Sequence, residues 1–308
     1  LKKKDILDLN QIHNGINSKV YKLKFKKNKN LILKIYPFED NFVSRRMRVE
    51  NDSLKYLKKN NFPVPGIYKS FFEFNCSFYE FQSGKKNLNA TKQLIDQCYD
   101  FLKKLFLLSR KTKINLFPNA KEACFNPNEI CDQIEKRFND LLKINNKALN
   151  NFLLLEFQDL FTKFSKIVKS KLGKKFKNNI SNSNRILSPS DFGLHNTLSE
   201  KNKLYFLDFE YFGWDDPIKL ICDFFWHPGN NMSKKLKDRF LNKVTNFFSK
   251  KYKNFKNKLY VLLPLYGLRW SLIILNCFVK KNYKNKILET EQLKKAKKIL
   301  NQVSHYGY

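Results

Sequence analysis

The spacing of the apolar residues changes near residue 83, and this change constrains the fold of the 308-residue chain more than any other feature. Before residue 83, runs rich in β-branched and aromatic residues predict strands at 19–25, 31–36, 67–74 and 77–81. One segment in this part, 43–59, has the apolar spacing of a helix, with Glu50 on its apolar face. After residue 83, helical spacing dominates, at 91–110, 128–144, 149–172 and from about 217 onward. We therefore expect an α+β protein with a small β-rich lobe at 1–82 and a larger helical lobe at 83–308.

The charge of the chain points to a nucleic-acid partner only at first sight. Sixty Lys and Arg residues against 27 Asp and Glu give a net charge of +33, as in many nucleic-acid-binding proteins. Only eight of the 60 are Arg, although the planar guanidinium is the better reader of bases. Lys is spread along the whole chain, as AT-rich codons would produce. We expect no nucleic-acid partner, and a basic nucleic-acid-binding protein is the least favoured alternative.

Three further features bear on location. The six cysteines include no C-x-x-C pair, which favours free thiols in a reducing cytoplasm over a zinc site. The first residues, Leu1-Lys-Lys-Lys-Asp5, do not resemble a secretory leader. The apolar run Tyr260–Val279 has the length of a membrane span but contains Pro264 and Arg269. A central Arg costs at least about 2.5 kcal/mol in a bilayer, so we expect a buried core helix and no membrane partner.

The sign of the charge reverses in one window. Residues 188–226 hold seven acidic side chains against three lysines, in a chain otherwise rich in Lys. Asp and Asn without a cluster of His or Cys are ligands for a hard cation. The window therefore predicts Mg²⁺ before zinc.

Spacing within this window suggests a catalytic loop. Asp191 and Asn196 have the D-x-x-x-x-N interval of phosphotransferase loops, and Asp208 follows a short predicted strand. Taken singly, these residues could be turn formers and a strand-end cap. The string Asp191-Phe192-Gly193 also spells the metal-binding motif of protein kinases, but that register needs another D-x-x-x-x-N loop upstream, and no Asp lies between Asp159 and Asp191. Asp191 is therefore assigned to the loop and Asp208 to the metal.

With this register, 188–198 and 207–217 resemble the aminoglycoside phosphotransferase and choline kinase family. The family typically has H-G-D-x-x-x-x-N, then a hydrophobic-D-F/W-E motif ending in D-P. Asp191, Asn196, Asp208 and the pair Asp216-Pro217 match it, whereas Ser188 and Ser190 stand where the family often has His and Gly. The resemblance implies a bilobal protein-kinase-like fold that uses ATP and Mg²⁺, with Asp191 orienting the acceptor hydroxyl and Asn196 and Asp208 binding the metal.

Residues of the first lobe match the family's nucleotide site. Lys34 lies in an apolar strand, where a lysine is costly unless it meets an anion. It matches the nucleotide-phosphate lysine, with Glu50 as its ion-pair partner. A solvated Lys and a surface Glu are the alternative. The resemblance places a phosphate-covering turn at Gly15 and the adenine-binding hinge at Glu80 and Gln82.

These features predict an ATP-dependent phosphotransferase that moves the γ-phosphoryl group to a hydroxyl of a small molecule, such as a sugar, an amino alcohol or an aminoglycoside-like compound. A catalytically silent nucleotide-binding relative is the main alternative. It is disfavoured because Lys34, Asp191, Asn196 and Asp208 are all present.

Overall fold

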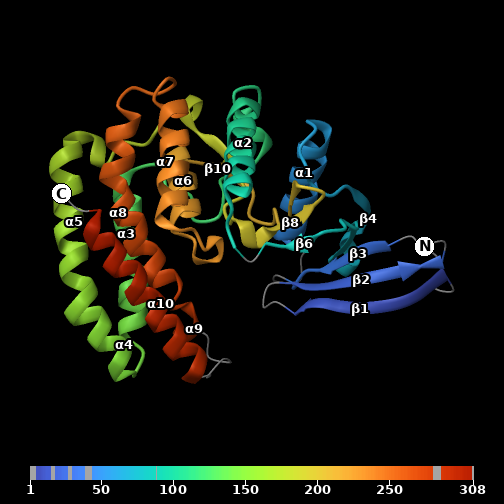
Figure 1. The fold of residues 1–308 in the computed structure, drawn as a ribbon, viewed down its shortest axis with the longest axis horizontal. Helices are drawn as coiled ribbons and strands as arrows, with labels where there is room; N and C mark the ends of the chain where they lie inside the picture. Colours follow the sequence, from blue (N-terminus) through green and yellow to red (C-terminus); the bar gives the residue numbers. More distant parts are fainter. Residues whose placement is uncertain are drawn as a thin grey trace. The chain divides into compact units, whose positions relative to one another are not determined.

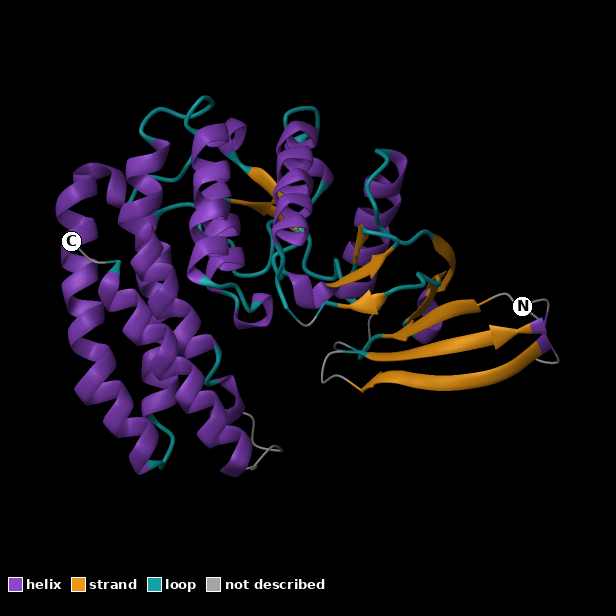
Figure 2. Ribbon diagram, viewed as in Figure 1, coloured by secondary structure: helices purple, strands orange, loops and turns teal. Residues whose placement is uncertain are grey.

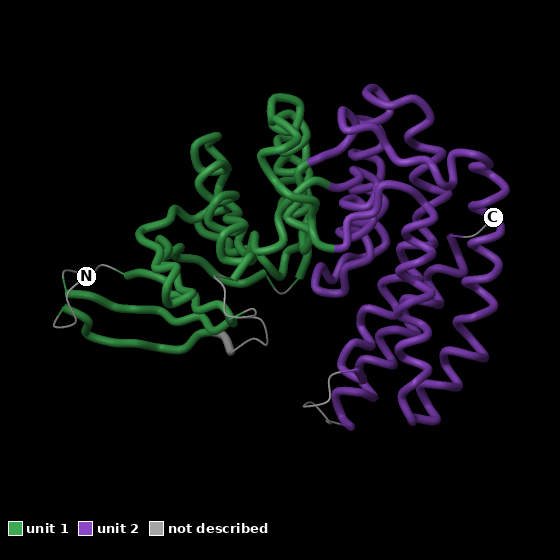
Figure 3. The backbone as a smooth tube through the Cα atoms, turned by 180° about the vertical axis from the view of Figure 1, so that it is seen from behind, with its two compact units in different colours: residues 1–121, 187–214 green, residues 122–186, 215–308 purple. Residues whose placement is uncertain are grey.

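The structure is a computed structural model that describes residues 5–14, 18–26, 30–38, 44–87, 89–279 and 286–306. The chain divides into two compact units, coloured separately in Figure 3. Unit 1 comprises residues 1–121 and 187–214, and unit 2 comprises 122–186 and 215–308. The lobe boundary predicted after Gln82 falls inside unit 1 and stays a prediction.

A five-stranded antiparallel sheet forms the first part of unit 1 (Figure 1). Its order is β1-β2-β3-β5-β4, with β1 at Ile6–Asn14, β2 at Lys19–Phe25, β3 at Asn30–Ile35, β5 at Cys76–Glu80 and β4 at Ile67–Phe71. Leu23, Phe25 and Leu31 form the centre of its apolar cluster. The structure confirms the four predicted strands, although β4 is shorter than expected, and adds β1 at the edge of the sheet.

Helix α1, Arg45–Lys59, connects β3 to β4 and confirms the predicted helix. Met47, Glu50, Leu54 and Leu57 are buried at spacings of three and four residues, so one face of the helix packs inward. This periodicity places Glu50 on the buried face of the helix, beside Met47 and Leu54 in the pattern.

The remainder of unit 1 supports the segment around Asp191. Helix α2, Lys92–Ser109, begins at Thr91, whose hydroxyl caps the first turn by accepting from Leu94 N–H. The Phe101 ring of α2 stacks on Phe206 and Phe192, at centroid distances of 3.9 and 5.7 Å. The small strands of the chain form two sheets, β6-β8-β9 and β10-β7; their bounds are Lys85–Lys86 (β6), Thr197–Glu200 (β8), Lys203–Phe206 (β9), Gly213–Asp215 (β10) and Ile186–Ser188 (β7).

Unit 2 is largely helical (Figure 2). Its helices are α3 (Pro127–Leu142), α4 (Lys147–Asn151), α5 (Gln158–Leu172), α6 (Pro217–Trp226), α7 (Lys234–Phe248), α8 (Phe255–Ile273), α9 (Asn276–Val279) and α10 (Lys286–His305). A π-helical segment, Phe152–Phe157, joins α4 to α5. The single helix predicted at 149–172 is therefore helical throughout but changes its hydrogen-bond pattern along its length.

The apolar run near the C-terminus is largely buried. Among the described residues, one segment, Phe255–Val279, is long and apolar enough to cross a membrane, and 61% of its apolar window is buried inside the protein. Arg269 is buried within α8 and its guanidinium binds Asp223 and Glu122, at 2.9 and 2.7 Å. A buried arginine with two carboxylate partners is expected in a protein core, which supports the prediction of a core helix.

Candidate functional site

Lys34 is the centre of a buried cluster of charges in unit 1. Its side chain leaves β3, and its ammonium nitrogen lies 2.7 Å from Glu50 Oε2, 2.8 Å from Asp208 Oδ1 and 3.3 Å from Glu210 Oε2. Lys34 and Glu50 are almost fully buried, whereas 40% of the Asp208 side chain is exposed. The structure thus brings Lys34, Glu50 and Asp208 together across 174 residues of sequence.

The cluster fixes the protonation of Lys34. Burial by itself would lower the pKa of this ammonium group, but Asp208, Glu50 and Glu210 outweigh burial and raise its pKa well above the usual value. Lys34 therefore carries a positive charge at neutral pH. Burial raises the pKa of Glu210, and Lys34 opposes this rise.

Glu50, on helix α1, contacts both Lys34 and the backbone next to Asp208. One carboxylate oxygen accepts from Lys34 and from the hydroxyl of Tyr36, which lies 2.5 Å away. The other accepts from the backbone N–H of Phe209 at 3.3 Å. Because Phe209 directly follows Asp208, Glu50 holds both the lysine and the backbone beside the aspartate.

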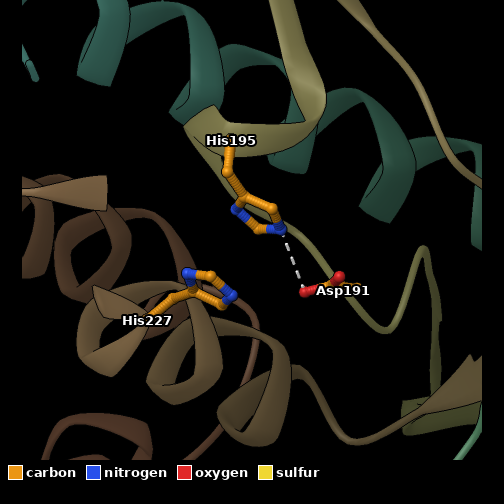
Figure 4. A group of neighbouring side chains, drawn as sticks. All are labelled: Asp191, His195 and His227. Carbon is orange, nitrogen blue, oxygen red and sulfur yellow. Dashed lines mark ion pairs between the residues drawn. The ribbon is translucent and has the colours of Figure 1, made fainter. Parts of the chain in front are cut away.

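Asp191 and Asn196 lie in one short loop. The Asn196 amide donates to the backbone carbonyl of Asp191 at 3.0 Å and to its Oδ2 at 3.3 Å. His195 Nε2 lies 3.2 Å from Asp191 Oδ1, and a dashed line joins the two side chains in Figure 4. The Phe192 ring is buried against Phe101, so its packing anchors the loop while 42% of the Asp191 side chain stays exposed.

The backbone joins this loop to the lysine cluster. The N–H of Leu207 donates to the carbonyl of Asn196 at 2.9 Å. The residue directly before Asp208 is therefore hydrogen-bonded to the loop. Asp208 itself has φ +63°, a left-handed conformation that is uncommon for residues other than glycine and is found at functional sites. The predicted loop residues and the predicted metal residue are thus held by one short stretch of backbone.

The two serines that depart from the family pattern support the loop. Ser190 has φ +68°, the left-handed region that favours glycine, and the family often has Gly at this position. The Ser188 hydroxyl accepts from Ser190 N–H at 3.0 Å, and the Ser190 hydroxyl donates to the carbonyl of Lys121 at 3.0 Å. Both serines therefore stabilise the backbone of the loop by hydrogen bonds.

The predicted hinge residues lie at the end of β5. The Glu80 carboxylate accepts from Lys58 and from Gly66 N–H, both at 2.9 Å, and the hydrogen bond from Lys58 lowers its pKa. The Glu80 backbone N–H donates to the Gly66 carbonyl at 2.9 Å. Gln82 lies in the following loop. The predicted phosphate-covering residue, Gly15, lies outside the described residues.

Glu210 and His195 were not predicted as site residues. Oxygens of Glu50, Asp208 and Glu210 lie within 4.8 Å of one another. The sequence carried a signal for Glu210, since an acidic side chain stands between Phe209 and Tyr211, two residues after Asp208. For His195 the signal was its place beside Asn196, inside the D-x-x-x-x-N interval.

The arrangement combines groups for three tasks. A buried ammonium group can bind phosphate oxygens, exposed carboxylate and amide oxygens can bind a hard cation, and an exposed carboxylate at Asp191 can accept a proton from a hydroxyl. These are the parts that phosphoryl transfer requires.

Comparisons with known proteins agree with this chemistry. The model of the phosphotransferase enzyme family, APH, matches residues 8–244. A comparison with curated protein sequences gives no significant match.

Solved structures share the fold at low sequence identity. A choline kinase from Cryptosporidium parvum Iowa II is 15% identical with a TM-score of 0.62, over 99% of this chain and 90% of that chain. The choline kinase LicA from Streptococcus pneumoniae is 16% identical with a TM-score of 0.59, over 97% and 94%. A spectinomycin phosphotransferase, in complex with ADP and spectinomycin, is 14% identical with a TM-score of 0.64, over 97% and 94%.

The likeness to these structures confirms the predicted α+β, protein-kinase-like fold. Because the family model spans most of the chain as well, from the first strand of the sheet into α7, the protein belongs to the phosphotransferase enzyme family and is a small-molecule kinase.

Proposed function

We propose that this kinase transfers the γ-phosphoryl group of ATP to a hydroxyl of a small molecule, with Mg²⁺ as cofactor. The observation that carries the proposal is the contact of Lys34 with both Glu50 and Asp208, joined through Leu207 and Asn196 to the loop of Asp191. Structural relatives that act on choline or bind spectinomycin support a small hydroxyl compound as acceptor. A sugar, an amino alcohol and an aminoglycoside-like compound all belong to this class.

Lys34 is assigned to the phosphates of the nucleotide. Its charge is secured by three carboxylates, and Glu50 fixes the direction of its ammonium group. Phosphate oxygens would take the place of Asp208 as its second partner. The proposed nucleotide site also includes the turn at Gly15 and the backbone of Glu80 and Gln82, in the proposed first lobe at 1–82.

Asp191 is assigned to the acceptor. Its exposed carboxylate accepts a hydrogen bond from the hydroxyl and takes its proton, while the hydroxyl oxygen bonds to the γ-phosphorus. The bond from this phosphorus to the oxygen that bridges it to the β-phosphorus breaks, and ADP leaves with that oxygen. Most of the rate would come from positioning and from neutralising charge.

The acidic residues around Lys34 fit a divalent cation. Glu50, Asp208 and Glu210 present three carboxylates to Lys34 and to Arg46, which lies 3.9 Å from Glu210, so acidic groups outnumber basic ones in a largely buried cluster, where excess charge is costly. We assign Asn196 and Asp208 to Mg²⁺, because their oxygens are the ligand type that this ion prefers. When bound, Mg²⁺ supplies positive charge that stabilises the phosphates during transfer.

The cysteines support a location in the cytoplasm. All six are free thiols, and Cys98, Cys124, Cys131 and Cys222 are buried. Burial raises the pKa of Cys98 and Cys222, which makes these thiols unreactive. A chain with six unpaired thiols is suited to a reducing compartment.

Two substitutions test the assigned roles against each other. Asp191→Asn removes the proton acceptor and should lower kcat by about 10²- to 10⁴-fold, with Mg²⁺-dependent nucleotide binding nearly unchanged. Asp208→Asn removes the carboxylate assigned to the metal and should also shift the Mg²⁺ midpoint for nucleotide binding upward, by about tenfold or more.

An ATP-consumption screen over sugars, amino alcohols and aminoglycosides first identifies the acceptor, and Mg²⁺ titrations of bound nucleotide then compare the variants. Asp140→Asn is a matched control, because Asp140 is exposed to a similar extent, 45%, and pairs with Lys143. If Asp191→Asn loses the metal and Asp208→Asn keeps it, the two roles are reversed. If no acceptor stimulates ATP consumption, the proposed function is wrong.

A further inference from the structure

His195 contacts the carboxylate to which the proposed function assigns the acceptor. Its Nε2 lies 3.2 Å from Asp191 Oδ1, and the ring points toward the carboxylate in Figure 4. On the other side, the Asn196 amide donates to Asp191 Oδ2. Both oxygens of Asp191 therefore have a partner from the same short loop.

The local backbone explains why His195 faces Asp191. The 3₁₀ turn Leu194–Asn196 is closed by a bond from Asn196 N–H to the Gly193 carbonyl at 3.1 Å. Leu194 is buried on one side of this turn, and the His195 side chain, 27% exposed, is four residues from Asp191. The turn thus sends an apolar side chain into the core and the Nε2 atom of the imidazole toward the carboxylate.

We propose that His195 is a positioning residue for Asp191. This inference rests on the proposed function: the imidazole contacts Oδ1 through Nε2 while the Asn196 amide donates to Oδ2, so the carboxylate is held from both sides before the acceptor binds. An exposed aspartate without this restraint would sample several rotamers, and a displacement of about 1 Å can cost about 100-fold in rate.

The kinetic test compares loss of the donor with its replacement. His195→Phe removes the N–H and should lower kcat by about 10- to 100-fold, whereas the KM for ATP and the Mg²⁺ midpoint stay close to wild type. His195→Gln places an amide N–H near the position of Nε2 and should recover most of the loss. His305→Phe, at an exposed position of α10, controls for removing a histidine.

A double-mutant cycle tests whether His195 acts through Asp191. In an Asp191→Ala background, His195→Phe should have no further effect on kcat, because the carboxylate to be positioned is absent. A residue that only supported the fold of the loop would cost a similar factor in both backgrounds. That outcome, or equal activity of His195→Phe and wild type, overturns the inference.

A measurement without turnover separates this inference from the proposed function. The chain has four histidines, so ¹⁵N signals of their rings can be assigned by single substitutions. The Nε2 signal of His195 should shift in Asp191→Ala and stay unchanged in Asp140→Ala. An unchanged signal in Asp191→Ala overturns the inference and leaves the proposed function standing, whereas a wild-type protein without phosphoryl transfer overturns both.

Discussion

At the scale of single residues, Lys34 has two roles that experiments can separate. It balances the buried carboxylates of Glu50 and Glu210, and it is proposed to bind ATP. Lys34→Ala should weaken ATP binding by about 10- to 100-fold, because charged hydrogen bonds contribute about 1.5–3 kcal/mol. It should also lower the free energy of unfolding, since Glu50 stays buried without its cation.

The double variant Lys34→Ala/Glu50→Gln distinguishes the two effects. It removes one of the two buried carboxylates that lose Lys34 and should regain part of the stability, measured by urea denaturation. Its ATP affinity, measured by titration calorimetry, should remain as weak as that of Lys34→Ala. Recovery of ATP binding in the double variant would remove Lys34 from the nucleotide site.

The sequence predicted those contacts in which a charged residue would be costly to bury without a partner. A lysine in an apolar strand and a glutamate on an apolar helix face each need a partner when buried, and the structure pairs Lys34 with Glu50. Glu210 was missed because an acidic residue near a strand end is compatible with many roles. The positive φ angles of Ser190 and Asp208 could not be predicted. Residues other than glycine seldom adopt this conformation, so neither residue type indicates it in the sequence.

At the scale of elements, helix α6 shows what helical spacing does not predict. Every residue from Pro217 to Trp226 is buried, so no polar face marks its orientation. Lys219 lies between Asp215 and Asp223, at 2.9 and 2.7 Å. The i,i+4 spacing of these pairs is visible in the sequence, but their complete burial depends on packing within unit 2.

The same limit applies to strand β1. Leu7, Leu9 and Ile12 are exposed to 57, 54 and 53%, and Asp8 and Asn10, residue types that are depleted in strands, alternate with them. Hydrophobic patterning detects a strand by its buried face. An edge strand that pairs only with β2 and leaves apolar side chains exposed carries a weaker signal, and it was not predicted.

The ion pairs of α6 give a prediction for stability. Lys219→Met should lower the free energy of unfolding by about 3–5 kcal/mol, because it leaves Asp215 buried without its cation. Lys219→Met/Asp215→Asn should regain much of this loss. Lys143→Met, which breaks the exposed pair with Asp140, is the control and should change stability by about 0–1 kcal/mol. Urea denaturation measures all three.

The pH dependence of this variant follows from the same contacts. Burial raises the pKa of Asp215 from its usual 3.8 to about 6 although Lys219 opposes the rise. The folded protein therefore holds this proton more tightly than the unfolded chain, so the contribution of Asp215 to stability improves as pH falls through about 6 toward 4. Without Lys219 the pKa rises further, and the deficit of Lys219→Met should be smaller at pH 5 than at pH 8. An equal deficit at both pH values would contradict this origin.

At the scale of the whole molecule, the family and the excess of lysine are separate properties. The family model matches residues 8–244 and the fold is shared over most of the chain, whereas the charge of +33 is a property of the composition. The fold class was predictable because the change from strand to helical spacing extends over long segments. The division of the chain was less predictable, since unit 1 takes residues from two separate parts of the sequence.

The net charge predicts how salt affects stability. With 60 basic against 27 acidic side chains, most charge on the surface is of one sign, and compaction brings like charges together. Salt shortens the screening length from about 30 Å at 0.01 M to about 8 Å at 0.15 M. Raising NaCl between these concentrations should therefore stabilise the folded chain by about 1 kcal/mol, which corresponds to a rise in Tm of about 2–4 °C.

Differential scanning fluorimetry at several NaCl concentrations measures this rise. Sucrose at equal osmolality is the control, because it stabilises proteins without screening charge. The buried pairs around Lys34 and Lys219 are shielded from the ions of the solution and should contribute little to the dependence. If Tm falls as NaCl rises, attractive surface pairs outweigh the repulsion among lysines, and the excess charge does not destabilise this fold.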